Sequence, residues 1–171
     1  MGLAPQMNAA ELKFIVDQNV GKMAKWLRMA GFDACLFAGA DDDALIAAAE
    51  AENRILVTRD RRIMKRRMIA GGRVRAVLIE SDRFRDQARQ LVHILGLDRS
   101  RFHPFTVCLE CNRPLEERNR EAVKERLPPY VYLTRDRFAE CPSCGRLYWQ
   151  GNHRQAMGLE MDGIQDGAVS R

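Results

Sequence analysis

The stretch Lys13-Phe-Ile-Val-Asp17 sets the expected fold, because a short apolar strand ends there directly on a carboxylate. Two later segments repeat the pattern: an apolar strand over residues 34–37 precedes the cluster Asp41-Asp42-Asp43, and one over residues 55–58 precedes Asp60. Strands that alternate with helices form a parallel sheet covered on both faces. Such sheets place ligand sites at the carboxyl ends of their strands, near a topological switch point. We therefore expect three acids to converge on one edge of the sheet.

Apolar residues at three- and four-residue steps predict the helices between these strands. The first helix follows Asp17 directly, and the second begins at an N-cap on Asp42 or Asp43. The expected elements are strands over residues 14–16, 34–37, 55–58 and 74–79 and helices over residues 17–30, 42–52 and 83–95. Together they predict a three-layer α/β domain with a mostly parallel sheet, complete by residue 97.

Length and charge set broad limits on function. The 171 residues suit one domain with a small additional module. The 28 Lys and Arg against 23 Asp and Glu give a formal charge of +5, which permits a polyanionic partner without requiring one. No apolar run could span a bilayer, and the N-terminus lacks the basic-then-apolar pattern of a secretory signal. We expect a cytoplasmic protein with no membrane association.

A change in composition divides the chain. After Leu97 prolines enter and the strand–helix alternation stops, which predicts a second module. The expected division is an N-terminal tail over residues 1–12, the α/β domain over 13–98, a zinc ribbon over 99–157 and a disordered, Gly- and Asp-rich tail over 158–171.

Four of the five cysteines form the two Cys-x-x-Cys pairs that predict this ribbon: Cys108 with Cys111, and Cys141 with Cys144. In a reducing compartment this spacing favours a metal over the alternative of disulfides. Asn112 follows the first pair and Gly145 the second, and both residue types tolerate the left-handed turn of a zinc knuckle. Four thiolates leave no ligand position for water, so we expect a structural zinc.

Four other side chains in or near the two modules have competing interpretations. Tyr148 and Trp149 could stack on RNA bases, but a module this small also needs them for its own core. His153 is surplus to four thiolates and is not predicted to bind the metal. Cys35 lies alone in an apolar strand and is predicted to be a small core residue.

The acids at the strand ends suit a hard divalent cation, because magnesium takes one or two carboxylates together with water and a substrate phosphate. Asp17, Asp42 and Asp60 are therefore the predicted catalytic acids and ligands for magnesium or manganese, which would activate water for phosphodiester cleavage. Asp82, after the fourth strand, is a further candidate. Each acid has a structural alternative, since Asp17 or Asp42 could cap a helix and Asp60 could pair with a neighbouring arginine. Their positions at successive strand exits favour a site.

A basic segment follows the third strand, with five basic residues in the seven positions 61–67. Such a run is consistent with an RNA-binding face and with a merely solvated one. The predicted RNA contacts are Lys22, Arg59, Arg61, Arg62, Lys65, Arg66, Arg67 and Trp149.

Two sets of motifs carry a family resemblance. The first set is Phe14-Ile-Val-Asp17, Gly21-Lys-Met-Ala-Lys-Trp-Leu-Arg28, Gly31-Phe-Asp33, Asp42 and Arg54-Ile-Leu-Val-Thr-Arg-Asp60. The second is Cys108-x-x-Cys111, Val123-Lys-Glu-Arg-Leu-Pro-Pro-Tyr-Val131, Cys141-Pro-x-Cys144-Gly145 and Tyr148-Trp149-x-Gly151-x-His153. Over about residues 13–157 the chain resembles the PIN-like ribonuclease family first recognised at the carboxyl end of the Mut-seven exonuclease. The resemblance implies a PIN-like fold and metal-dependent RNase chemistry with acids at Asp17, Asp42 and Asp60. The family often has an acid after the first Asp, where this chain has Gln18 and Asn19.

The leading hypothesis is a metal-dependent endoribonuclease that hydrolyses RNA phosphodiester bonds in RNA processing or decay, with the ribbon aiding RNA binding. The alternative is a non-catalytic adaptor that binds RNA, a ribosome or another ribonucleoprotein through a retained PIN-like fold. A phosphoacceptor receiver is disfavoured because the chain lacks an acidic pair after its first strand. A dinucleotide fold is disfavoured because no Gly-x-Gly-x-x-Gly follows that strand.

Overall fold

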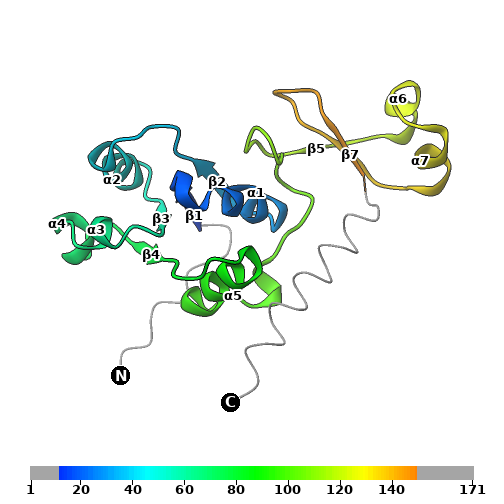
Figure 1. Cartoon of the computed structure of the whole chain (residues 1–171). Coiled ribbons are helices and arrows are strands. Elements are labelled where there is room, and N and C mark those ends of the chain that lie inside the picture. Colours follow the sequence, from blue (N-terminus) through cyan, green and yellow to red (C-terminus); the bar gives the residue numbers. More distant parts are fainter. Residues whose placement is uncertain (1–11, 150–171) are drawn as a thin grey trace, which may run out of the picture.

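The computed structural model describes residues 12–149, apart from the side chain of Arg99, and its first half is a parallel sheet between two layers of helices (Figure 1). The strands are β1 (Lys13–Val16), β2 (Asp33–Leu36), β3 (Ile55–Thr58) and β4 (Ala76–Leu78). They are parallel and lie in the order β2-β1-β3-β4. The predicted α/β class is confirmed, and the switch point lies at β1, where the chain moves from one side of the strand to the other.

Alternating side chains of the strands pack against different helices. The helices of this half are α1 (Lys22–Met29), α2 (Asp42–Ala51), α3 (Arg61–Met64), α4 (Arg67–Ala70) and α5 (Phe84–Leu95). Phe14 and Val16 face a core shared with α1 and α5, whereas Ile15 and Leu56 face a core shared with α2, α3 and α4. Each fully buried side chain of this size contributes about 1.5–3 kcal/mol. The continuous apolar strands therefore reflect burial on both faces.

Three predicted boundaries differ from the structure. A 3-10 turn, η2 (Gln18–Val20), precedes α1, so the helix does not begin at Asp17. The N-cap of α2 is Asp41 rather than Asp42 or Asp43, because the Asp41 carboxylate accepts hydrogen bonds from the amides two and three residues ahead. The fourth strand is shorter than predicted, since the amide of Val74 donates to the carbonyl oxygen of Met68 instead of to a neighbouring strand.

The second half contains a small antiparallel sheet of order β5-β6-β7, which lies apart from the parallel sheet (Figure 1). Its elements are β5 (Glu116–Arg118), α6 (Arg120–Val123), η4 (Lys124–Arg126), α7 (Pro129–Thr134), β6 (Phe138–Glu140) and β7 (Leu147–Trp149). Among residues 12–149, its apolar cluster has only four buried side chains: Val123, Leu127, Val131 and Phe138. A core this small needs an additional source of stability such as a metal.

The connection between the halves, which includes η3 (Arg99–Arg101), is anchored on α1. The ring of Phe102 meets the rings of Trp26 and Phe32 edge to face, and the amide of His103 bonds to the carbonyl of Ala30 at 2.9 Å. Gly31 has a φ of 95°, and a Cβ there would lie 2.1 Å from the carbonyl oxygen of His103. This close approach requires glycine and fixes where the chain enters the second half.

Candidate functional site

Asp17 leaves β1 at the carboxyl edge of the parallel sheet and contacts the end of β3. Its Oδ2 accepts hydrogen bonds from Oγ1 of Thr58 and from Nδ2 of Asn19, both at 2.6 Å. The carboxylate makes no capping bond to the following turn, so the capping alternative does not describe it. Because both bonds use Oδ2, the other carboxylate oxygen is the one with which Asp17 would bind a cation.

Thr58 and Asn19 organise this edge, and neither was predicted as a site residue. Thr58 is 0% exposed, and its Oγ1 also accepts the amide of Asp60 at 3.0 Å. Oδ1 of Asn19 accepts the amide of Arg59 at 3.0 Å. These bonds join the ends of β1 and β3 beside Asp17. The available signal in the sequence was a hydroxyl at the end of an otherwise apolar strand.

Asp60 lies at the same edge but is already engaged. Its carboxylate caps α3 through the amide of Arg62 and forms an ion pair with the Arg62 guanidinium, both at 2.7 Å. The hydrogen bonds from the Arg62 side chain and amide hold the pKa of Asp60 below its usual range. The structural alternative for Asp60 is therefore present. A surface ion pair of this kind is weak, however, and a cation or phosphate can exchange for it.

Asp42 lies in the first turn of α2 and is partly exposed, with Asp41 providing the cap. The hydrogen bond and the charge of Asp60 raise the pKa of Arg62, and the charge of Asp42 adds to them, which places both acids near one guanidinium. Asp82 is paired with Arg59, and its side chain is 88% exposed. Among residues 12–149, however, only the four cysteines bring three or more ligand atoms close enough together to hold an ion. The edge gathers the predicted acids without forming a tight carboxylate cage.

Most of the predicted basic contacts are paired with acids of this edge. The ion pairs are Arg59 with Asp82, Arg61 with Glu80, Arg62 with Asp60 and Arg66 with Asp43. Lys22, Lys65 and Arg67 are exposed. The edge is therefore balanced in charge, and RNA phosphates would have to replace surface carboxylates as partners of the arginines.

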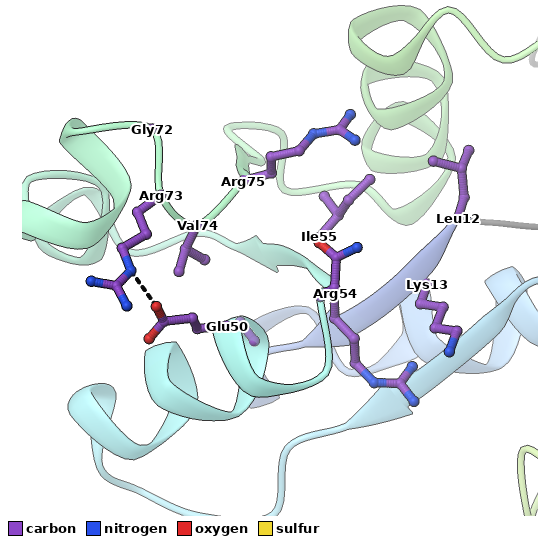
Figure 2. Close-up of a pocket in the computed structure, with 11 residues that line it drawn as sticks. Leu12, Lys13, Glu50, Arg54, Ile55, Gly72, Arg73, Val74 and Arg75 are labelled. Carbon is purple, nitrogen blue, oxygen red and sulfur yellow. Dashed lines mark ion pairs between the residues drawn. The ribbon is translucent and has the colours of Figure 1, made fainter. Parts of the chain in front are cut away.

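A cavity of about 170 Å³ lies at the opposite edge of the sheet, where β1 and β3 begin (Figure 2). Lys13, Arg54, Arg73 and Arg75 line it, and Arg73 is paired there with Glu50. None of the predicted acids lines this cavity. The candidate site at the carboxyl edge therefore rests on its side-chain chemistry and not on this cavity.

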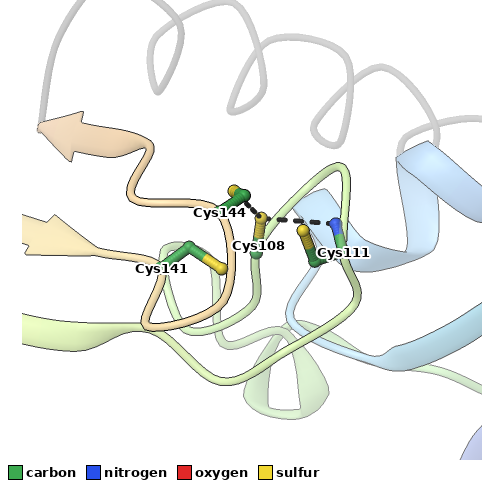
Figure 3. Close-up of side chains that lie close together, drawn as sticks. All are labelled: Cys108, Cys111, Cys141 and Cys144. Atoms are coloured by element: carbon green, nitrogen blue, oxygen red, sulfur yellow. Dashed lines mark hydrogen bonds between the residues drawn. The ribbon is translucent and has the colours of Figure 1, made fainter.

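The four cysteines of the two knuckles face one another (Figure 3), and their sulfur atoms all lie within 4.8 Å of each other. Sγ of Cys108 lies 3.8 Å from Sγ of Cys144. Tetrahedral zinc with Zn–S bonds of about 2.3 Å places its sulfurs about 3.8 Å apart. The four side chains therefore fit a structural zinc ion, as the spacing predicts.

Tyr148 supports the first knuckle. Burial opposes ionisation of Cys108, but the hydroxyl of Tyr148 at 3.2 Å and backbone amides of the knuckle outweigh it and lower the Cys108 pKa to about 6. The thiolate is the form that binds zinc. The same hydroxyl accepts the amide of Leu109 at 3.2 Å. Sequence reasoning considered Tyr148 only as a core or stacking residue.

The remaining candidates are placed as follows. Trp149 is partly buried and packs against the core of the second half, which does not test its predicted contact with RNA. Cys35 is partly buried and packs against the core under α2, as predicted. His153 lies outside the described residues.

Comparison with known proteins gives one match. The model of the protein family described as "Mut7-C RNAse domain" matches residues 12–161, which include both the parallel sheet and the zinc module. No curated protein and no solved structure matches the chain. In residues 12–149 every helix is too short or too polar to cross a membrane.

Proposed function

The chain belongs to the Mut7-C RNAse domain family, and on this premise we propose that it is a metal-dependent endoribonuclease that acts at the carboxyl edge of its parallel sheet. The observation that carries the proposal is Asp17, which is held between the ends of β1 and β3 by Thr58 and Asn19 at 2.6 Å with one oxygen left for a cation. Open α/β sheets bind their ligands at the carboxyl ends of the strands near the switch point, which is where Asp17 lies.

Asp17 would hold magnesium or manganese directly, and Asp42 and Asp60 would hold it through water or after Arg62 releases Asp60. Such an ion would lower the pKa of its bound water and neutralise charge on the phosphate. Thr58 and Asn19 both donate to Oδ2 of Asp17 and so keep its carboxylate in one orientation. Arg62, once released, would bind a phosphate oxygen of the RNA.

The basic residues of the same edge would bind the RNA backbone. Lys22, Lys65 and Arg67 are exposed, and the paired arginines can exchange a weak surface partner for a phosphate. The formal charge of +5 supports RNA as the partner. The zinc ribbon would add a further contact through Trp149, because aromatic side chains can stack on bases. We further propose a role in cytoplasmic RNA processing or decay, with a ribosome or another ribonucleoprotein as a source of specificity.

A second candidate function is a non-catalytic adaptor that binds RNA or a ribosome. It is favoured by two observations: the carboxylates at the edge do not form a metal-sized cluster among the described residues, and Asp60 is engaged by Arg62. An adaptor would need the basic residues of the edge but not the free oxygen of Asp17.

Asp17→Asn separates these functions. The change keeps the size of the side chain but removes the charge that binds the cation, so we expect RNA cleavage with magnesium or manganese to fall more than about a hundredfold while RNA binding persists. Cleavage is measured on structured and single-stranded RNA, with Asp43→Asn as the matched control that should have a mild effect. A wild-type protein that binds RNA and never cuts it would establish the adaptor instead.

A further inference from the structure

The first zinc knuckle contacts β2, an edge strand of the parallel sheet. Oδ1 of Asn112 accepts the amide of Ala34 at 2.8 Å, and Nε of Arg28 donates to the carbonyl of Ala34 at 2.7 Å. Because β2 pairs only with β1, these two backbone groups of Ala34 have no strand partner on the open side. The two side chains therefore satisfy an edge that would otherwise be left open.

The same two side chains also hold the knuckle. Arg28 donates from Nη1 to the carbonyl oxygens of Leu109 at 2.8 Å and Glu110 at 3.0 Å, which are the two residues between the knuckle cysteines. Nδ2 of Asn112 donates to Oδ1 of Asp33 at 2.6 Å. We call the contacts that Arg28, Asp33 and Asn112 make between the knuckle and β2 the docking contact.

Asp33 is itself fixed to the centre of the sheet. Arg54 donates to both oxygens of Asp33, at 2.7 and 3.2 Å, and also to the carbonyl of Phe14 in β1 at 3.2 Å. The Arg54 side chain is only 10% exposed. A continuous set of bonds therefore runs from the knuckle through β2 to β1 and the start of β3. Arg28, Asp33 and Arg54 lie in motifs that carry the family resemblance, yet the predicted catalytic edge does not use them.

We propose that Arg28, Asp33 and Asn112 are positioning residues for the zinc site, so that the parallel sheet holds the first knuckle in its metal-binding shape and zinc in turn stabilises β2. A knuckle whose backbone is already fixed loses less freedom when its thiolates bind the ion, which raises the affinity. Reciprocity follows because a coupling between two sites acts equally in both directions. The proposal rests on the zinc site and is independent of whether the chain cuts RNA.

The second knuckle offers a matched control for Asn112. Asn112 and Gly145 both have positive φ, 57° and 67°. Their amides make equivalent hydrogen bonds, to the carbonyl oxygen of Cys108 at 3.0 Å and to that of Cys141 at 2.9 Å. Asn112→Gly therefore keeps the turn and removes only the docking side chain. Gly145→Asn introduces the same side chain at the equivalent turn, where a Cβ would meet only Oε1 of Glu140, at 4.0 Å, among the described residues.

The experiment measures release of zinc from the full, zinc-loaded chain to a chelator. We expect Asn112→Gly to release zinc roughly tenfold faster and to speed hydrogen exchange at the Ala34 amide, because two hydrogen bonds, one to a carboxylate, are lost. Gly145→Asn should release zinc within about twofold of wild type. Val77→Ala, which removes buried atoms from β4, should lower the stability of the sheet without changing release.

A change of charge at Asn112 tests the contact itself. Asn112→Asp places two carboxylates together and should speed release at least as much as Asn112→Gly. If Asn112→Gly does not fold, Arg28→Gln, which removes the bonds to the knuckle carbonyls, tests the same coupling. Release unchanged in these variants, or equal acceleration by Val77→Ala, would each overturn the proposal.

Discussion

The two zinc knuckles have the same backbone turn but different attachments. In the first, the amide of Cys108 donates to the carbonyl oxygen of Arg113 at 2.8 Å, and in the second the amide of Cys141 donates to that of Arg146 at 3.0 Å. The first knuckle is docked on α1 and β2 by Arg28 and Asn112, whereas the second is held inside its own module, where Arg126 bonds to the carbonyl of Gly145. A zinc ion bound by both would therefore connect the parallel sheet to the antiparallel one.

Of the substitutions that distinguish the two knuckles, Cys144→Ser should have the largest effect on zinc content and local stability. Loss of one thiolate should remove stoichiometric zinc, because metal affinity in such a site is folding free energy. The antiparallel sheet, whose core is small, should then loosen while the first knuckle keeps its docking contact. Metal analysis should show the zinc-to-protein ratio fall from about one to near zero, and hydrogen exchange should rise more over residues 138–149 than over residues 108–113.

A wild-type protein that contains no stoichiometric zinc and is unaffected by a chelator would contradict the metal site. Equal loosening of both knuckles would contradict the difference in their attachment. Cys35→Ser, outside both knuckles, is the matched control and should leave the zinc content unchanged, since Cys35 packs under α2.

A smaller effect is expected for Tyr148→Phe, which removes the hydroxyl that contacts Sγ of Cys108 and the amide of Leu109. Groups that hydrogen-bond to a metal ligand typically change metal affinity by about 10–100-fold, and we expect about tenfold weaker zinc binding in a chelator competition. Among the described residues, the second knuckle has no tyrosine in such a contact. The weaker zinc binding should therefore arise from the first knuckle. An unchanged affinity would reduce Tyr148 to a packing role.

The sequence predicts local features of this molecule better than it predicts contacts between distant segments. The apolar run at residues 55–57 was sufficient to predict a buried parallel strand, whereas the catalytic role of the acid at residue 60 stays a prediction. Three adjacent aspartates could not show which one caps α2, because each is chemically able to do so. Thr58 and Asn19 lie 39 residues apart along the chain and become neighbours only through the pairing of β1 with β3, which periodicity does not reveal.

The zinc module shows the same limit. The sequence predicted the four ligands and the left-handed turn at Asn112, because spacing and residue type determine them. It did not predict that the Asn112 side chain is used, since its partners lie 78 and 79 residues away along the chain. Asparagine was interpreted as a substitute for glycine, whereas the structure assigns its amide a contact that glycine cannot make.

The smallest predicted effect is a pH dependence that arises at Asp33, on the docked side of the comparison. Burial opposes ionisation of Asp33, but hydrogen bonds from Arg54 and Asn112 and the charges of Arg54 and Lys13 outweigh it and hold its pKa below the usual range. A carboxyl whose pKa is lower in the folded state stabilises the fold above its unfolded pKa of about 3.9. This stabilisation is lost as the pH falls through the folded pKa.

Wild type and Asp33→Asn should therefore differ in unfolding free energy by a constant amount between pH 7 and about pH 4.5, and the difference should shrink below about pH 4. We expect about 1 kcal/mol, because the Asp33 side chain is 37% exposed and solvent screens its charge. Denaturant unfolding with a chelator present keeps zinc release out of the measurement and leaves the bond to Arg54 as the main contribution. A difference that grows on acidification would show that Asp33 is not held as its charged form by Arg54.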